Sequence, residues 1–114
     1  MLAGCLVWGM SQPGLAYESR GARPCAGWQE FRQEERAGYP LNAAIYQTWL
    51  VGYLSGIVAG SGMDFLAGTD NESVFRMVDD YCDDNLRMNL AAAGTHVARS
   101  LMQQKGIVNL PTLP

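Results

Sequence analysis

The amino-acid sequence predicts an all-α fold: a small orthogonal four-helix bundle held by one disulfide and preceded by a cleaved signal peptide. Apolar residues recur at helical spacing in four segments, and no alternation typical of a β-strand is visible. Removal of an apolar leader would leave two cysteines, Cys25 and Cys82. An even number of cysteines in a small exported chain indicates a disulfide rather than a metal site. A bridge closing a loop of about 58 residues would stabilise the fold by roughly 4 kcal/mol.

The first 16 residues are expected to be a secretory leader, which places the protein in the periplasm. An apolar run at 2–10 is followed by the small residues Gly14 and Ala16, which suit signal peptidase cleavage before Tyr17. Because no positive charge precedes the run, we expect the true start to lie upstream. Two alternatives stay open. The string Leu-Ala-Gly-Cys at 2–5 has the form of a lipoprotein box, and the segment could also be a buried strand or helix of a cytoplasmic protein.

Residues 17–114 are expected to form a single helical domain with flexible N- and C-terminal ends. The first helix runs from about Cys25 to Arg36, with Trp28 and Phe31 on one face. The second starts near Asn42, a residue type that favours the N-cap, and ends near Ala59. Its apolar residues recur at helical spacing: Ile45, Trp49, Leu50, Tyr53, Leu54 and Ile57. A glycine-rich loop with a short apolar insert at 63–66 follows.

The third helix has the clearest start signal. Thr69 and Glu72 match the capping-box pattern, in which a threonine is followed three residues later by a glutamate. Its apolar face is expected to contain Val74, Met77, Val78, Tyr81 and Cys82. Asn85 is expected to end this helix and to cap the fourth, which runs from Leu86 to about Gln104 with the stripe Leu90, Ala93, Val97 and Leu101. Gly106 would stop it.

The segment 41–63 is long enough to span a membrane and carries no charge. Polar side chains and glycines dilute its hydrophobicity, so a soluble core helix is expected instead. Gly52, Gly56 and Gly60 are spaced by four residues, which predicts a close approach of a neighbouring helix. The residues expected to pack the helices together are Trp28, Phe31, Trp49, Gly52, Tyr53, Gly56 and Tyr81.

Charge and motif composition exclude several functions. The net charge is −3, and one lysine with dispersed arginines makes no phosphate-binding surface, so no nucleic acid is expected. His96 is the only histidine, and neither Ser55 nor Ser100 has an adjacent base. The two cysteines lack the further ligands of a metal site, and no glycine-rich loop follows a strand. We therefore expect no enzymatic activity and no cofactor or metal.

One acidic cluster stands out on the third helix. Two arginines could neutralise it partly through i, i+4 pairs, Arg76 with Asp80 and Arg87 with Asp83. The first interpretation is a solvated helix face; a divalent-ion site or a surface for a basic partner are the alternatives. As a candidate partner surface the cluster comprises Asp79, Asp80, Asp83 and Asp84.

Short strings in the chain resemble the HdeA-type periplasmic proteins. They are Cys25 followed by Trp28 and Phe31, then Val51-Gly52-Tyr53, then Tyr81-Cys82 leading through Asn85 into the fourth helix. The strings Trp49-x-x-Gly52-Tyr53-Leu54-Ser55-Gly56 and Tyr81-Cys82-x-x-Asn85 are also similar to other small exported proteobacterial proteins and to immunity proteins of type VI secretion systems. The resemblance covers residues 25–104. Leu86 stands where such sequences often have proline, and the lysine-rich termini of the acid chaperone are absent.

This resemblance implies a non-enzymatic periplasmic binding protein, of the HdeA-like envelope or acid-stress chaperone type. In acid, protonation of the carboxylates would make the net charge positive, and the helices would separate to expose apolar faces to clients. The alternative is an immunity-type or assembly-partner protein that binds one specific envelope or toxin protein. Either function implies a protein partner or client without a membrane span, and either is compatible with a homodimer.

Overall fold

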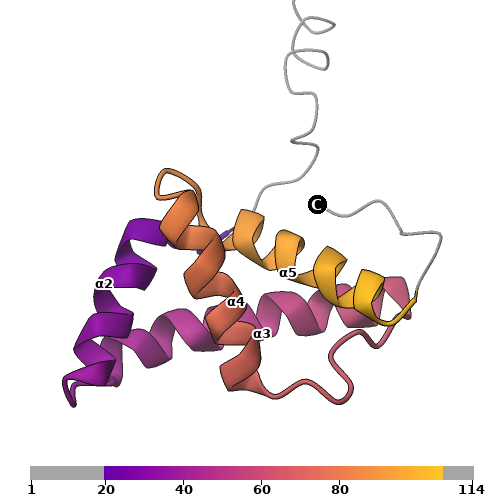
Figure 1. The fold of residues 1–114 in the computed structure, drawn as a ribbon, viewed down its shortest axis with the longest axis horizontal. Coiled ribbons are helices and arrows are strands. Elements are labelled where there is room, and N and C mark those ends of the chain that lie inside the picture. The colour runs from indigo at the N-terminus through magenta and orange to yellow at the C-terminus, as the bar shows by residue number, and fades with distance from the viewer. Residues whose placement is uncertain (1–19, 107–114) are drawn as a thin grey trace, which may run out of the picture.

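The computed structural model describes residues 20–106 and contains four helices, α2 (Cys25–Arg36), α3 (Leu41–Ser61), α4 (Asn71–Asp84) and α5 (Leu90–Gln104) (Figure 1). Within this range the β-type pairing consists of one isolated bridge between Pro24 and Asn89. The predicted all-α fold is therefore confirmed. The expected leader, its cleavage before Tyr17, lipidation of Cys5 and the flexible ends lie outside the described residues.

The longest helix, α3, runs along one side of the molecule, with α2 packed against it near one end and α5 along the other half (Figure 1). The remaining helix, α4, packs against α2 and α5. The disulfide between Cys25 and Cys82 joins the first turn of α2 to the last turn of α4. The predicted pairing of these cysteines is confirmed, and both are fully buried.

The bounds of α2 match the prediction, whereas α3 begins earlier than expected. The N-cap of α3 is Pro40, and the expected cap Asn42 lies inside the helix, where its amide donates to Glu34 Oε1 at 3.2 Å. Pro40 starts the helix without a side-chain cap because its fixed φ is already close to helical. The helix ends at Gly62, whose φ of 72° lies in the left-handed region that glycine adopts without strain.

The starts of α4 and α5 correct two further predictions. The N-cap of α4 is Asp70, which accepts a hydrogen bond from Ser73 N at 2.7 Å, so the expected Thr69–Glu72 capping box is wrong by one residue. The N-cap of α5 is Asn89, which accepts from Ala92 N at 3.0 Å. Residues 86–89 are therefore a connection and not the first turn of α5. Asn85 caps only α4, through a bond from its amide to Tyr81 O.

This connection is held against the start of α2 by backbone hydrogen bonds. Cys25 N donates to Met88 O at 2.9 Å, and Leu90 N donates to Arg23 O at 2.8 Å. The first bond satisfies an amide of the first turn of α2, which has no side-chain cap. At the other end of the fold, Lys105 Nζ donates to Ala67 O at 2.6 Å and ties the end of α5 to the loop between α3 and α4.

The core is formed by the apolar faces that the spacing predicted, with exceptions on α3. Trp28, Leu50, Leu54, Val78 and Val97 are almost completely buried. The aromatic residues expected to pack the helices, Phe31, Trp49, Tyr53 and Tyr81, are half-buried against this core. Ile45 is 51% exposed, although its position in the apolar repeat predicted burial, because α3 turns this side away from the other helices.

Close helix packing occurs at glycines other than the predicted ones. A side chain at Gly52, Gly56 or Gly60 would meet no atom within 4 Å, so the expected approach of a neighbouring helix there is wrong. The tight positions are Gly27, where a Cβ would collide with the Tyr46 hydroxyl, and Gly94, where it would lie 2.8 Å from Tyr53 Cδ2. In addition, no helix within residues 20–106 has the length and hydrophobicity needed to cross a membrane.

Candidate functional site

The site is centred on Arg32, a charged residue in the interior of the molecule. It lies seven residues after Cys25 and four after Trp28, so helical geometry places all three on the buried face of α2. Arg32 is only 6% exposed. Because a buried charge is costly unless it is paired and hydrogen-bonded, its partners determine whether this part of the fold is stable.

Asp79 on α4 is the main partner of Arg32. The guanidinium binds it in a bidentate manner, with Nε donating to Oδ1 and Nη2 to Oδ2, both at 2.9 Å. Trp28 Nε1 donates to the same Oδ1 at 2.7 Å, and Arg36 Nη2 lies 3.4 Å from Oδ2. The Asp79 side chain is 18% exposed. One carboxylate thus receives hydrogen bonds from three side chains of α2.

Two glutamates complete the set of anions around the guanidinium. Arg32 Nη1 donates to Glu35 Oε1 and Nη2 to Glu72 Oε2, each at 2.9 Å. Gln47 Nε2 of α3 also donates to Glu35 Oε1, at 3.0 Å, so the network reaches a third helix. The hydrogen bond to Asp79, followed by those to Glu72 and Glu35, raises the pKa of Arg32 above its already high ordinary value and outweighs the opposite effect of burial.

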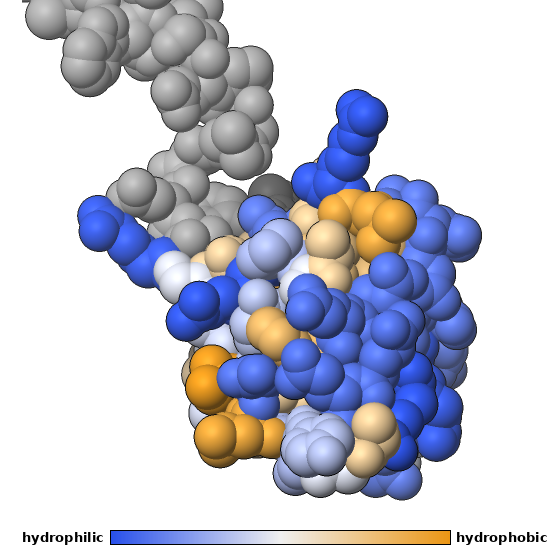
Figure 2. Space-filling view, turned by 90° about the vertical axis from the view of Figure 1, so that its left-hand side faces the viewer, coloured by the Kyte–Doolittle hydropathy of each residue, from blue (hydrophilic) through white to orange (hydrophobic). Residues whose placement is uncertain are grey.

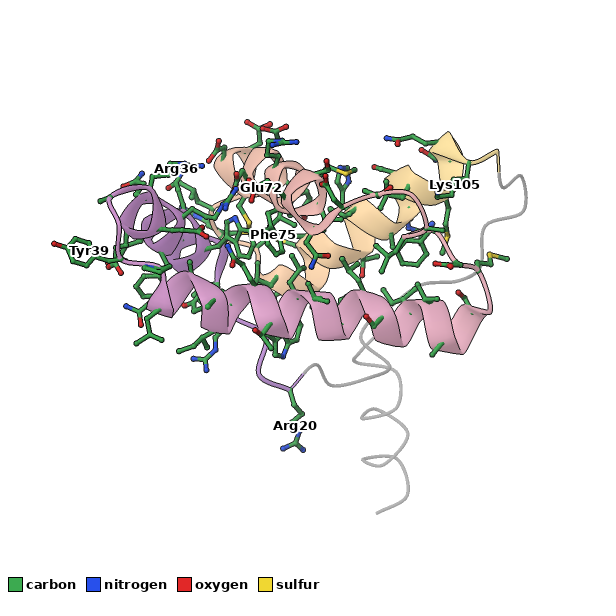
Figure 3. The ribbon with its side chains drawn as sticks, turned by 90° about the horizontal axis from the view of Figure 1, so that it is seen from below. Arg20, Arg36, Tyr39, Glu72, Phe75 and Lys105 are labelled. Atoms are coloured by element: carbon green, nitrogen blue, oxygen red, sulfur yellow. A yellow bond between two sulfur atoms is a disulfide. The ribbon has the colours of Figure 1, made fainter. Side chains whose placement is uncertain are left out.

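Aromatic rings cover the guanidinium on its apolar side. The Arg32 Cζ atom lies 5.8 Å from the ring centroids of both Trp28 and Phe75, a distance typical of cation–π contacts. These two rings also contact each other edge to face, with 5.8 Å between their centroids. Figure 3 shows Phe75 directed into the space between α4 and α3, and Arg36 and Glu72 nearer the outer rim. We call the group Trp28, Arg32, Glu35, Glu72, Phe75 and Asp79 the Arg32 cluster.

An open cleft of about 590 Å³ lies over the polar side of the cluster. Its walls come from α2 and α4 and carry charges of both signs: Arg32, Glu35, Arg36, Glu72, Arg76, Asp79, Asp80 and Asp83. The anions outnumber the cations. In the part of the chain that the structure describes, no group of acidic, histidine or cysteine side chains has the arrangement of a metal site.

The structure divides the acidic cluster that the sequence predicted as one surface. Asp79 is turned inward to Arg32, whereas Asp80, Asp83 and Asp84 are exposed. The expected pairs of Arg76 with Asp80 and of Arg87 with Asp83 do not form among the described residues. Arg76 instead donates to Ser73 Oγ at 3.3 Å, and Asp83 accepts from Gln29 Nε2 at 2.8 Å. Asp83 is therefore bound by a residue of α2 in place of Arg87, whereas Arg76 bonds within α4 to Ser73 in place of Asp80.

Sequence reasoning missed Arg32, although a signal was present. The face of α2 that contains Cys25 and Trp28 includes position 32, and a charged residue on an apolar face requires a buried partner. His96, for which no catalytic role is expected, is exposed, and its ring centroid lies 5.0 Å from that of Tyr81.

Comparisons of the chain with protein-family models, with curated proteins and with solved structures find no match.

Proposed function

We propose that this is a non-enzymatic envelope protein whose helices separate in acid and then bind aggregation-prone client proteins. The observation that supports the proposal is the enclosure of Arg32 by Asp79, Glu72 and Glu35. An arginine keeps its charge at any accessible pH, whereas carboxylates are neutralised in acid. Acidification would therefore remove the compensating charges and leave the buried cation without a counter-ion.

The magnitude of this effect favours the Arg32 cluster over the surface charges as the acid-sensitive element. Exposed ion pairs contribute about 0.3–0.5 kcal/mol each on a helix. Loss of one partner of a buried pair typically costs about 3–5 kcal/mol, a large fraction of the roughly 5–15 kcal/mol that stabilises a domain. Loss of the charge on Asp79, whose side chain is 18% exposed, would thus affect stability more than loss of the charges on the exposed aspartates, whereas the pair with Glu72, 53% exposed, contributes less.

The Arg32 cluster also contains the apolar rings that would become exposed to solvent in acid. Trp28 is 1% and Phe75 9% exposed, and both rings lie against the guanidinium at the interface of α2 and α4. Separation of the helices at Arg32 would uncover these rings, while the disulfide would keep the opposite ends of the same helices joined. The exposed apolar surface would then be available to clients.

The test compares acid unfolding with client protection in one set of variants. Asp79→Asn imitates the protonated carboxyl, and Glu30→Gln on the exposed side of α2 is the matched control. We expect Asp79→Asn to move the acid transition, followed by near-ultraviolet circular dichroism, to higher pH, and Glu30→Gln to leave it unchanged. Wild-type protein should suppress light scattering by a client that aggregates at about pH 3, below the ordinary carboxyl pKa of about 4.

A protein that stays folded at that pH and has no effect on aggregation would contradict the proposal. The second candidate is then an immunity-type or assembly-partner protein with a preformed surface. Its support is the cleft over the Arg32 cluster, which is rimmed by the exposed Asp80 and Asp83 and could receive basic side chains of one partner. Capture of a single partner at neutral pH, together with a neighbouring toxin or secretion gene, would favour it.

A further inference from the structure

A second hollow lies between α3 and α4, apart from the cleft over the Arg32 cluster. It is an open groove of about 360 Å³, a volume within the range of about 300–1,000 Å³ that ligand sites occupy. The groove and the cleft share no lining residue. Each helix contributes residues that are spaced by one, three or four positions and lie on one side of it: Ala44, Gln47, Thr48 and Val51 from α3, and Asn71 and Phe75 from α4.

The lining of the groove carries no charge, whereas all eight residues that line the cleft are charged. A charged ligand group placed in the groove would give up its hydration without gaining an ion pair from the lining. The groove is therefore suited to an uncharged occupant, in contrast to the cleft.

Phe75 forms the apolar floor of the groove and is held in place from its other side. It is 9% exposed, and Figure 3 shows it directed between α4 and α3. Its ring contacts Trp28 edge to face and lies 5.8 Å from Arg32 Cζ. Val51, which is half-buried, and Ala44 extend the apolar floor on α3. Because Phe75 is already packed, this floor exists before a ligand binds, which lowers the conformational cost of binding.

Three polar side chains surround the floor and retain hydrogen-bonding capacity. Gln47 Nε2 donates to Glu35 Oε1 at 3.0 Å, which orients the amide and leaves its oxygen as an acceptor. Within residues 20–106, the side chains of Thr48 and Asn71 have no hydrogen-bond partner. Donors and acceptors beside an apolar floor match an extended polypeptide, in which peptide groups alternate with side chains.

The apolar surface continues from the groove toward the start of α3. Leu41 lies three residues before Ala44 on the same side of the helix and is 75% exposed, and Ile45 is 51% exposed. Figure 2, which looks at this end of the molecule, shows a hydrophobic area at the lower left against a mainly hydrophilic surface. From Leu41 to Val51 the helix rises by about 15 Å, a length that about five residues of extended peptide span.

We propose that the groove binds an uncharged, extended segment of about five residues from another protein, with one large apolar side chain seated on Phe75 and Val51. Peptide groups beside that residue hydrogen-bond to the amides of Gln47 and Asn71, and a second apolar side chain contacts Leu41. The site is complete in the folded protein at neutral pH. It does not depend on the separation of helices in acid, so either proposal can fail without the other.

Titration of the isotope-labelled full chain at neutral pH, followed by nuclear magnetic resonance, tests the site. The probes are blocked five-residue peptides of alanine with leucine, glutamate or lysine at the centre. We expect the leucine peptide to shift the resonances of the Val51 methyl groups, the Phe75 ring and the Asn71 side-chain amide. The glutamate and lysine peptides should bind at least about tenfold more weakly, because the groove offers their charges no partner.

Three variants of the full chain locate the contact. Ala44→Glu, which places a charge in the lining, should weaken binding of the leucine peptide at least about tenfold. Ala59→Glu makes the same change at an exposed position of α3 outside the groove and should leave binding unaltered. Asn71→Leu should weaken binding several-fold, because it removes hydrogen bonds to the peptide while keeping the size of the side chain. Circular dichroism verifies that the variants are folded.

A groove whose resonances do not respond to millimolar leucine peptide overturns the proposal, whether it holds only water or another part of this chain. Shifts confined to Leu86 and Met88, which are exposed hydrophobic residues outside α3, also overturn it. Equal binding of the three peptides, or equal effects of Ala44→Glu and Ala59→Glu, contradicts it as well. Tighter binding by Asn71→Leu would show simple apolar contact in place of peptide recognition.

Discussion

Cys25 and Arg32 lie two helical turns apart on the same face of α2, and each fastens α2 to α4. Cys25 does so through the disulfide to Cys82, and Arg32 through the bidentate pair with Asp79. The first connection is covalent and insensitive to pH, whereas the second requires a charged carboxylate. The α2–α4 interface therefore combines a covalent attachment near one end of α2 with an electrostatic one two turns further along the helix.

Removal of one partner from the Arg32 pair should be more damaging than removal of both. We expect Asp79→Asn to lower the free energy of unfolding at neutral pH by about 3–5 kcal/mol, because a buried cation loses its main counter-ion. The double variant Arg32→Met with Asp79→Leu should recover part of this loss, since well-packed apolar residues can replace a buried pair, although Trp28 Nε1 loses its acceptor. Urea unfolding measures both, and a double variant less stable than Asp79→Asn would contradict the explanation.

The disulfide should contribute strongly to stability. Replacement of Cys25 and Cys82 by alanine is expected to reduce the free energy of unfolding by about 2–5 kcal/mol, as for native disulfides of small domains. The measurement is the unfolding midpoint in urea, compared with that of the wild type under oxidising conditions. Detection of two free thiols at these positions in natively produced protein would show that the bridge does not form.

Two glycine-to-alanine substitutions should have opposite effects. Gly56→Ala in dilute, monomeric protein should stabilise the fold by about 0.5–1 kcal/mol, because the added methyl group meets open space and the helix loses a flexible residue. Gly94→Ala should destabilise it by about 1–3 kcal/mol, because its Cβ would lie 2.8 Å from Tyr53 Cδ2. Thermal unfolding of both variants gives the comparison, and equal shifts would refute the packing described for α5 and α3.

The N-cap of α4 should contribute a pH-dependent part of stability. The hydrogen bond from Ser73 lowers the pKa of Asp70 below its ordinary value of 3.8. The native state thus favours the charged form, so the contribution is complete well above pH 3.8 and is lost as the pH falls through the lowered pKa. Asp70→Asn, which retains a capping oxygen without the charge, should be less stable than the wild type at neutral pH. The difference in urea midpoint between the wild type and Asp70→Asn should become smaller as the pH is lowered toward that pKa. A difference that does not change with pH would contradict the capping role of the charged Asp70.

Helix number, helix faces and disulfide pairing could be predicted from sequence because each depends on local periodicity or on a small set of cysteines. The N-cap residues were harder to predict from sequence. Asp70 and Thr69 are both residue types that favour the N-cap of α4, and Asn89 and Asn85 are identical candidates for the N-cap of α5. The Arg32 cluster required knowledge of which helix faces α2. Helical spacing places Asp79 beside the apolar face of α4, but only the α2–α4 packing turns it toward Arg32 rather than toward water. The exposure of one side of α3 was not predicted. Small, uncharged residues on a helix favour burial, but they do not identify which part of the fold would cover them.

The Cys25–Cys82 bridge also gives the chain the connectivity of a ring with two tails. The ring spans a sequence separation of 57 residues and contains all of α3. A mechanical load applied at the two ends of the chain would pass from Cys25 directly to Cys82 and would bypass everything between them. About 200 Å of contour length would thus be hidden from extension until a reductant cuts the bridge. Force spectroscopy in the presence and absence of a reducing agent would show this difference as a change in the length released per molecule.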